Sequence, residues 1–154
     1  MARYIISIII PVLNEATIIK QTLGQLTQYS EIEIIVVDGG SQDDTVTIAK
    51  SSVKVITVSG KNRAGQMNAG ANLAQSDILL FLHADTQLPA NFIELVSKTL
   101  NQNQIIAGAF ELAIDGSGIP LRGIEILVKV RSRLLSLPYG DQALFISKQA
   151  FIKA

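Results

Sequence analysis

Apolar residues in this chain occur in short continuous runs, separated by segments in which they recur at helical spacing. Five apolar residues at 78–82 lie between the polar residues Asp77 and His83. A short apolar run with polar boundaries is typical of a strand that is buried on both faces, as in a parallel sheet covered by helices. Comparable segments predict further strands at 4–12, 31–37, 53–58, 105–114 and 143–146.

The segments between these runs have helical character. Apolar residues fall on one face of the segments 16–29 and 89–100, which predicts amphipathic helices there. Ser41, with Asp44 three residues later, resembles a capping box and predicts a short helix that begins at Ser41. A further helix is expected after the basic, glycine-containing loop 60–65. The alternation of strands and helices predicts an α/β fold with three layers, α/β/α, and a mostly parallel sheet whose strand ends lie along one edge.

Composition narrows the classes of function. The chain has 154 residues, which favours a single domain, and its 13 basic and 13 acidic residues give zero net charge. This balance offers no electrostatic footprint for general nucleic-acid binding, so no nucleic-acid partner is expected. The absence of cysteine excludes thiolate sites and disulfides, and a single histidine excludes a multi-histidine metal site. Any bound metal must rely on carboxylates, which favours Mg²⁺ or Mn²⁺.

No run reaches the ~18 consecutive apolar residues that a membrane-spanning helix needs, so we expect a soluble, cytoplasmic domain.

The segment 121–137 is predicted to be a helix with charged residues on one side and apolar residues on the other. Arg131 falls in the middle of the apolar side. One interpretation is an ordinary amphipathic helix whose Arg131 side chain reaches the surface. The other is a helix that faces an anionic ligand, or that contacts the inner membrane face peripherally.

Charged residues follow successive predicted strands at Asp38, Arg63 and Asp85. The shared sheet edge brings them to one place, where open α/β sheets bind their ligands. His83 precedes Asp85 by two residues, and residues at i and i+2 of an extended segment point to the same side. A carboxylate and an imidazole so placed suit a divalent cation that holds phosphate oxygens. Each residue also has a structural alternative: Asp38 and Asp85 as turn or helix-initiating residues, Arg63 as a solvated charge, and His83 as a hydrogen-bonded strand residue.

Four motifs connect these positions with a known family. They are Pro11-Val12-Leu13-Asn14-Glu15, Val37-Asp38-Gly39-Gly40-Ser41-Gln42-Asp43-Asp44-Thr45, Arg63-Ala64-Gly65-Gln66-Met67-Asn68-Ala69-Gly70 and His83-Ala84-Asp85. In this order they resemble the family 2 glycosyltransferases with the GT-A fold, and the resemblance covers most of the chain. It implies the nucleotide-diphospho-sugar transferase (GT-A) type of fold, a nucleotide-diphosphate-sugar donor and an inverting transfer to an acceptor hydroxyl.

The resemblance also implies which residues lie on the nucleoside side of the site. Pro11, Asn14 and Glu15 match the loop that lies against the nucleoside. Asp38 matches the aspartate that hydrogen-bonds the base, which is commonly uracil. A UDP-sugar is therefore the expected donor.

On the phosphate side, Arg63 matches a basic position near the diphosphate. Asp85 matches the last position of the family's Asp-x-Asp motif, which is a ligand of Mg²⁺ or Mn²⁺. His83 stands where the family has the first aspartate of that motif. The resemblance therefore implies a metal site that relies mainly on one carboxylate, with His83 as a weaker ligand.

The acceptor side of the family's pattern is incomplete in this sequence. The family usually places its catalytic base in a Glu-Asp pair, and no such pair occurs before Ala154. We expect one GT-A-like domain over 1–154, with the nucleotide-sugar-binding half at 1–114 and the start of an acceptor half, cut short, at 115–154. Asp141 is the best remaining carboxylate for the base, and its alternative role is a turn residue before the final strand.

Three functions from different classes stay open. The first is an inverting glycosyltransferase. The second is a non-catalytic nucleotide-sugar-binding module, which the missing Glu-Asp pair favours. The third is a partner-dependent fragment that completes its site by homo-oligomerisation. The sequence does not identify the sugar or the acceptor.

Overall fold

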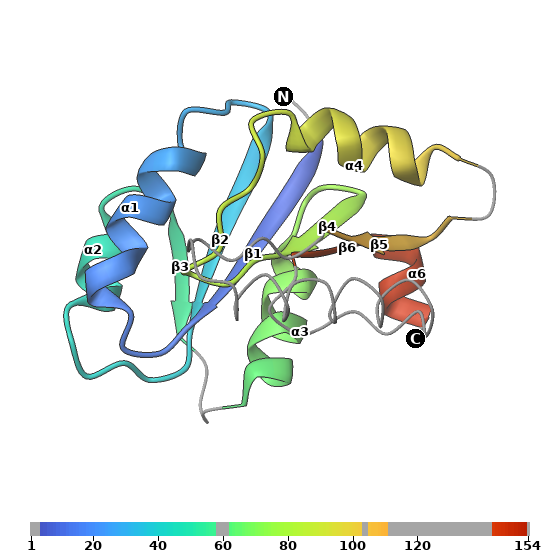
Figure 1. Cartoon of the computed structure of the whole chain (residues 1–154). Coiled ribbons are helices and arrows are strands. Elements are labelled where there is room, and N and C mark those ends of the chain that lie inside the picture. Colours follow the sequence, from blue (N-terminus) through green and yellow to red (C-terminus); the bar gives the residue numbers. More distant parts are fainter. Residues whose placement is uncertain (1–3, 58–61, 103–104, 111–142, 154) are drawn as a thin grey trace, which may run out of the picture.

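A mostly parallel sheet forms the centre of the chain. The computed structural model describes residues 4–57, 62–102, 105–110 and 143–153, in which the strand order is β3-β2-β1-β4-β6-β5 (Figure 1). The first four strands along the chain pair in parallel, and β6 runs antiparallel to both β4 and β5. The strands are β1 (Ile6–Val12), β2 (Ile32–Asp38), β3 (Lys54–Thr57), β4 (Ile78–Phe81), β5 (Ala107–Ala109) and β6 (Leu144–Ser147).

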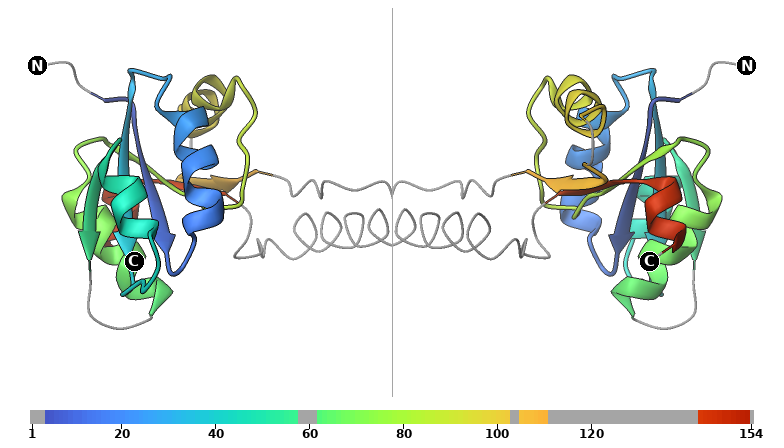
Figure 2. Two further views of the ribbon diagram at one scale, coloured as in Figure 1. Left: turned by 90° about the vertical axis from the view of Figure 1, so that its left-hand side faces the viewer. Right: turned by 90° about the vertical axis from the view of Figure 1, so that its right-hand side faces the viewer.

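Helices cover both faces of this sheet. The helices are α1 (Ala16–Leu26), α2 (Thr45–Lys50), α3 (Arg63–Leu73), α4 (Phe92–Leu100) and α6 (Lys148–Lys153). Ile8 of β1 belongs to a buried cluster with residues of α1, α2 and α4, and the next residue, Ile9, belongs to a second cluster with residues of α3 and α6. Figure 2 shows α1 and α4 together on one side of the strands. Because successive strand residues face opposite sides, the continuous apolar run of β1 serves both cores, and the predicted three-layer α/β/α fold is confirmed.

Several predicted boundaries need correction. The predicted start of a helix at Ser41 is wrong, because α2 begins at Thr45. Ser41 is held in a loop instead, where its backbone N–H donates to Asp38 and its hydroxyl accepts from the backbone of Asn14. The helix predicted from residue 89 begins at Phe92. The predicted helix 121–137, residues 111–114 of a predicted strand and Asp141 all lie outside the described residues.

The winding of the chain reverses between β1 and β4. From β1 the chain passes to β2 and β3 through α1 and α2 on one face, and then returns through α3 on the other face to place β4 beside β1. In open α/β sheets, ligands bind beyond the carboxyl ends of the strands at such a reversal. The loops that follow β1 and β4 flank this position.

A small polar network is buried near the other end of the same strands. The hydroxyl of Ser7 donates to the Glu33 carboxylate at 2.6 Å, which also accepts from the backbone N–H of Gln75 at 2.8 Å. Ser76 donates its backbone N–H to the Ser7 hydroxyl at 3.2 Å. These polar groups are satisfied within the protein, so the network has a structural role.

Among the described helices, none combines the length and the apolar character needed to cross a membrane.

Candidate functional site

The loops after β1 and β2 are joined by their own polar groups. Asn14 has a positive φ of 57°, which asparagine tolerates better than most residues. Its backbone N–H donates to the Ser41 hydroxyl at 2.9 Å, and its side-chain oxygen accepts from the backbone N–H of Gln42 at 2.8 Å. The two loops therefore form one unit at the carboxyl edge of the sheet.

Asp43 strengthens this unit at the start of two helices. Its carboxylate accepts from the backbone N–H of Ala16, the first residue of α1, at 3.1 Å. It also accepts from the hydroxyl and, at 3.0 Å, from the backbone N–H of Thr45, the first residue of α2. The Thr45 hydroxyl, together with the backbone N–H groups of Thr45 and Ala16, lowers the pKa of Asp43 from its ordinary value. A carboxylate at a helix start satisfies N–H groups that lack partners within the helix.

Asp38 ends β2 and shapes the turn that follows it. The side chain is only 1% exposed. Its carboxylate oxygens accept from the backbone N–H of Gly40 at 3.0 Å and from that of Ser41 at 3.1 Å. Gly40 has φ of +97°, a conformation that favours glycine. The structure thus gives Asp38 the turn role that the sequence left open, and its contact with a base stays a prediction.

Arg63 begins α3 and reaches the end of β4. The helix is capped by Asn62, whose side-chain oxygen accepts from the backbone N–H of Ala64 at 3.1 Å. Arg63 is exposed, and its Nη1 lies 3.3 Å from Nε2 of His83. The structure therefore brings together two of the predicted site residues, which are twenty positions apart in the sequence.

Asp85 is exposed in a turn just beyond β4. The turn is closed by a bond from the Thr86 backbone N–H to the His83 carbonyl oxygen at 3.1 Å, so the expected extended geometry does not continue past His83. Thr22 of α1, which is buried, donates its hydroxyl to the carbonyl oxygen of Ala84. The loop that carries Asp85 is thus fixed from the α1 side.

The donor atoms present here fit a divalent cation in part. The exposed carboxylate of Asp85 is a ligand type that Mg²⁺ and Mn²⁺ prefer. Nε2 of His83, in contrast, faces the guanidinium of Arg63, and a cation at that nitrogen would meet this positive charge. Within the described part of the chain, no group of three or more histidine, aspartate or glutamate side chains is placed to hold a metal. Asp85 fits as a ligand that shares the ion with phosphate oxygens, and His83 does not fit in this arrangement.

Gln66 was not among the residues that the sequence predicted for the site. Its side chain is buried, and its Nε2 donates to the carbonyl oxygens of Val12 at 2.9 Å and Val37 at 2.7 Å. These carbonyls lie at the ends of β1 and β2, so one side chain of α3 connects two strand ends. The only sequence signal was its place one helical turn after Arg63, within a motif that the sequence had already singled out.

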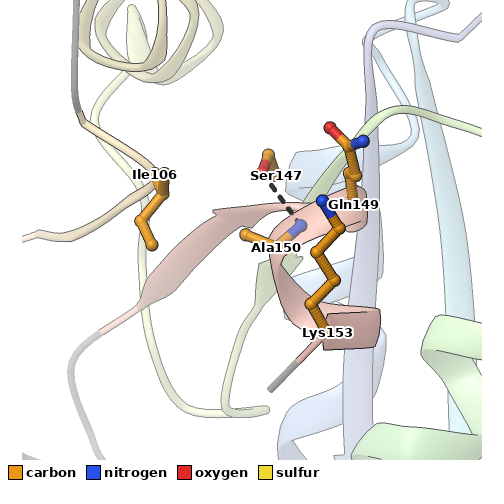
Figure 3. A pocket seen from close by; sticks show the side chains of 5 residues that line it. All are labelled: Ile106, Ser147, Gln149, Ala150 and Lys153. Carbon is orange, nitrogen blue, oxygen red and sulfur yellow. Dashed lines mark hydrogen bonds between the residues drawn. The ribbon is translucent and has the colours of Figure 1, made fainter.

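A surface hollow of about 370 Å³ lies at a different place, where α6 meets β5 and β6. Its lining is drawn in Figure 3 and consists of Ile106, Ser147, Gln149, Ala150 and Lys153. Ser147 pairs with Ile78, the first residue of β4, so the hollow lies toward the end of β4 opposite to His83. It has no carboxylate in its lining, and we assign the candidate site to the strand ends instead.

The mostly parallel sheet with helices on both faces has the GT-A fold, which it shares with solved glycosyltransferase structures. Residues 7–151 match the family described as glycosyl transferase family 2, and the chain belongs to this family. An uncharacterised glycosyltransferase of Rickettsia conorii is 36% identical over 132 residues, which cover 79% of this chain and 22% of that protein. The chain thus spans about a fifth of the length of this curated relative.

Solved structures agree with this fold. Glucosyl-3-phosphoglycerate synthase from Mycobacterium tuberculosis, in complex with Mn²⁺, UDP and glucosyl-3-phosphoglycerate, matches with a TM-score of 0.69 at 21% identity. The match covers 95% of this chain and 57% of the synthase. TarS 1–349 of S. aureus, in complex with UDP-GlcNAc, matches with a TM-score of 0.60 at 20% identity, over 75% of this chain and 37% of that 1–349 chain. At such identities the likeness shows the fold alone.

Proposed function

We propose that this chain binds a nucleotide-diphosphate sugar at the carboxyl ends of β1, β2 and β4, and serves an inverting glycosyl transfer to an acceptor hydroxyl. Family membership supports glycosyl transfer from such a donor. UDP is the proposed nucleotide, supported by the UDP and UDP-GlcNAc complexes of proteins with the same fold. The observation that carries the proposal is the approach of Arg63 to His83, with 3.3 Å between Nη1 and Nε2, where the winding of the chain reverses.

The phosphate side of the site consists of Arg63 and Asp85. A guanidinium forms charge-assisted and often bidentate hydrogen bonds with phosphate oxygens, so Arg63 holds the diphosphate of the donor. Asp85 is the protein ligand for Mg²⁺ or Mn²⁺, which when bound offsets the negative charge that grows on the departing nucleoside diphosphate. His83 keeps Arg63 beside the end of β4 through their contact.

The nucleoside side consists of the joined loops after β1 and β2. Pro11 and Glu15 are half-buried and Asn14 is exposed at this edge. Asp38 shapes the turn at Gly40 and is only 1% exposed, so its proposed hydrogen bond with the base requires this turn to open. In this proposal the loop backbone and Asp38 together recognise the nucleoside.

The acceptor side is assigned to the later part of the chain. Inverting transfer needs a base that removes the proton of the acceptor hydroxyl as the sugar is attacked. Asp141 is proposed for this role within an acceptor half at 115–154, while 1–114 binds the donor. If Asp141→Asn leaves acceptor turnover unchanged while donor binding persists, that assignment is wrong.

Calorimetry with UDP in the presence of MnCl₂, followed by an assay of UDP-sugar hydrolysis and transfer, tests the proposal. Binding together with turnover supports the enzyme. Binding without turnover supports the non-catalytic binding module. If neither occurs, the UDP site is contradicted, and a second copy or another chain becomes the explanation to test.

A further inference from the structure

One face of α3 approaches the sheet unusually closely. Gly70 lies on this face, and a Cβ placed on it would be 2.5 Å from Cγ2 of Ile9 and 3.1 Å from Cγ2 of Val37. Real Cβ atoms essentially never show a separation of 2.5 Å, so the absence of a side chain at residue 70 allows the helix to pack directly on β1 and β2.

Gln66, one turn before Gly70, uses this close packing. Its side chain is 5% exposed, and its amide nitrogen bonds the carbonyl oxygens at the ends of β1 and β2. The Val12 carbonyl also accepts from the backbone N–H of Gly39 at 2.9 Å. A Cβ on Gly39 would lie 3.1 Å from Nε2 of Gln66, so this glycine leaves room for the amide. The amide therefore joins α3 to the ends of β1 and β2.

Arg63 lies one turn before Gln66 and on the same side of the helix, since residues three apart are neighbours on a helix surface. Arg63 is exposed, and its described polar contact is with His83. Its long side chain starts from the first turn of α3. One turn later, the bonds of Gln66 connect the same helix to the ends of β1 and β2.

We propose that Gln66 is a positioning residue: it fixes the first turn of α3, and so it places the Arg63 side chain beside the ends of β1, β2 and β4, where Arg63 binds the donor diphosphate. Gly70 and Gly39 supply the space that this arrangement requires. The inference rests on the proposed function in assigning Arg63 to the diphosphate. It gives a physical reason for the spacing Arg63, Gln66 and Gly70 in one motif.

The test compares UDP affinity, measured by calorimetry with MnCl₂, in the wild type and in Gln66→Met, Arg63→Ala and the double variant. Methionine keeps the length of the side chain and removes both donated bonds. Gln66→Met should weaken UDP binding about tenfold, the scale of losing one charge-assisted hydrogen bond. In the Arg63→Ala background the same change should weaken binding less than about twofold, because coupled residues are not additive. If Gln66→Met does not fold, Gln66→Asn replaces it, since its shorter amide cannot reach both carbonyls.

Ser7→Ala is the matched control. It removes a buried polar bond from the network at the opposite end of β1 and should lower the melting temperature while leaving UDP affinity unchanged. A second readout needs no ligand: the chain has one histidine, so the ring proton signals of His83 in NMR spectra are assigned without ambiguity. In Gln66→Met these signals should move toward their positions in Arg63→Ala, at the same pH.

The outcomes separate the two proposals. The role of Gln66 is supported if Gln66→Met weakens UDP binding in the wild-type background but has almost no effect in the Arg63→Ala background, and if the His83 signal shifts. Unchanged UDP affinity and an unchanged His83 signal in a less stable Gln66→Met, as in Ser7→Ala, overturn it. If the wild type does not bind UDP, the proposed donor is wrong, and the His83 signal alone then decides whether Gln66 positions Arg63.

Discussion

Polar side chains at the carboxyl edge of the sheet divide into two groups at the scale of single residues. The side chains of the first group form hydrogen bonds with backbone groups of the neighbouring loops and strand ends; they are Asp38, Asn14 and Gln66. Arg63 and Asp85 are exposed instead. The first group builds the site, and the second group is left to meet a charged ligand.

Replacing Asp85 by alanine should therefore affect chemistry more than stability. We expect Asp85→Ala to lower sugar transfer at least about a hundredfold, the scale seen when one preorganised electrostatic group is removed. The rate of UDP release from a UDP-sugar, with Mg²⁺ or Mn²⁺, is the measurement. Glu94→Ala, which removes an exposed carboxylate from the first turn of α4, should leave this rate unchanged. Near-normal transfer by Asp85→Ala would exclude Asp85 from the mechanism.

At the scale of elements, helix placement depends on contacts that act across the fold. The carboxylate of Asp43 accepts from the backbone N–H groups of the first residue of α1 and of the first residue of α2. The helix α3 approaches the sheet at Gly70. The bond from Ala16 to Asp43 and the packing of Gly70 against Ile9 both join residues that lie far apart in the sequence. Both decide where the loops of the candidate site lie.

Gly70→Ala should destabilise the protein by forcing α3 away from β1. Overpacking of a core of this kind typically lowers the free energy of unfolding by about 1–3 kcal/mol. Gly24→Ala is the matched control, since no atom lies within 4 Å of a Cβ at this exposed helical position. That substitution should raise the free energy of unfolding by about 0.4–1 kcal/mol. Urea unfolding measures both, and equal effects of the two substitutions would refute the close packing of α3.

Asp43→Asn should lower the melting temperature at neutral pH. The ionised carboxylate accepts the bonds from Thr45 and Ala16, which lower the pKa of Asp43 below its usual value of 3.8 in the folded state. This stability is present above the unfolded pKa and is lost as the pH falls through the lowered folded pKa. The difference between wild type and variant should therefore shrink in acid.

Asp44→Asn serves as the control for this pH dependence, because the exposed carboxylate of Asp44 makes no capping bond. Thermal unfolding across the acid range compares the two variants with the wild type. Curves for Asp43→Asn and Asp44→Asn that run parallel at every pH would contradict the role of Asp43 at the two helix starts.

Part of this architecture could be predicted from sequence, for reasons that differ between elements. The cores of β1, β2 and β4 are continuous apolar runs, and strands buried on both faces have this pattern whatever surrounds them. The helix α2 begins later than its sequence pattern predicts because Ser41 bonds to Asn14, a partner that lies far away in the sequence. The insertion of β6 between β4 and β5 also depends on long-range pairing.

The candidate site shows the same division. The proximity of Arg63 and His83 could be predicted from the sequence, because the loops that follow parallel strands lie along one edge of the sheet. Gln66 could not be found, since a glutamine within a helix is usually exposed, and only the approach of α3 buries it. The turn at Asp85 is equally hard to predict, because its closing bond joins two backbone groups and so leaves no side-chain signal in the sequence.

At the scale of the whole molecule, the order of the strands decides where a ligand binds. The chain reverses its winding between β1 and β4, and the loops with Asn14 and Asp85 follow these two strands. Helices cover both faces of the sheet, and the carboxyl edge is where these loops gather. The central claim is therefore that a nucleoside diphosphate binds at this edge.

The most direct measurement follows the ring signals of His83, the single histidine of the chain, by NMR during titration with UDP. With Mg²⁺ present, the signals should shift and saturate together with the heat of UDP binding. With Mn²⁺ in place of Mg²⁺, the paramagnetic ion beside Asp85 should broaden them selectively. Signals that neither shift nor broaden while UDP binds would place the nucleotide elsewhere and contradict the account.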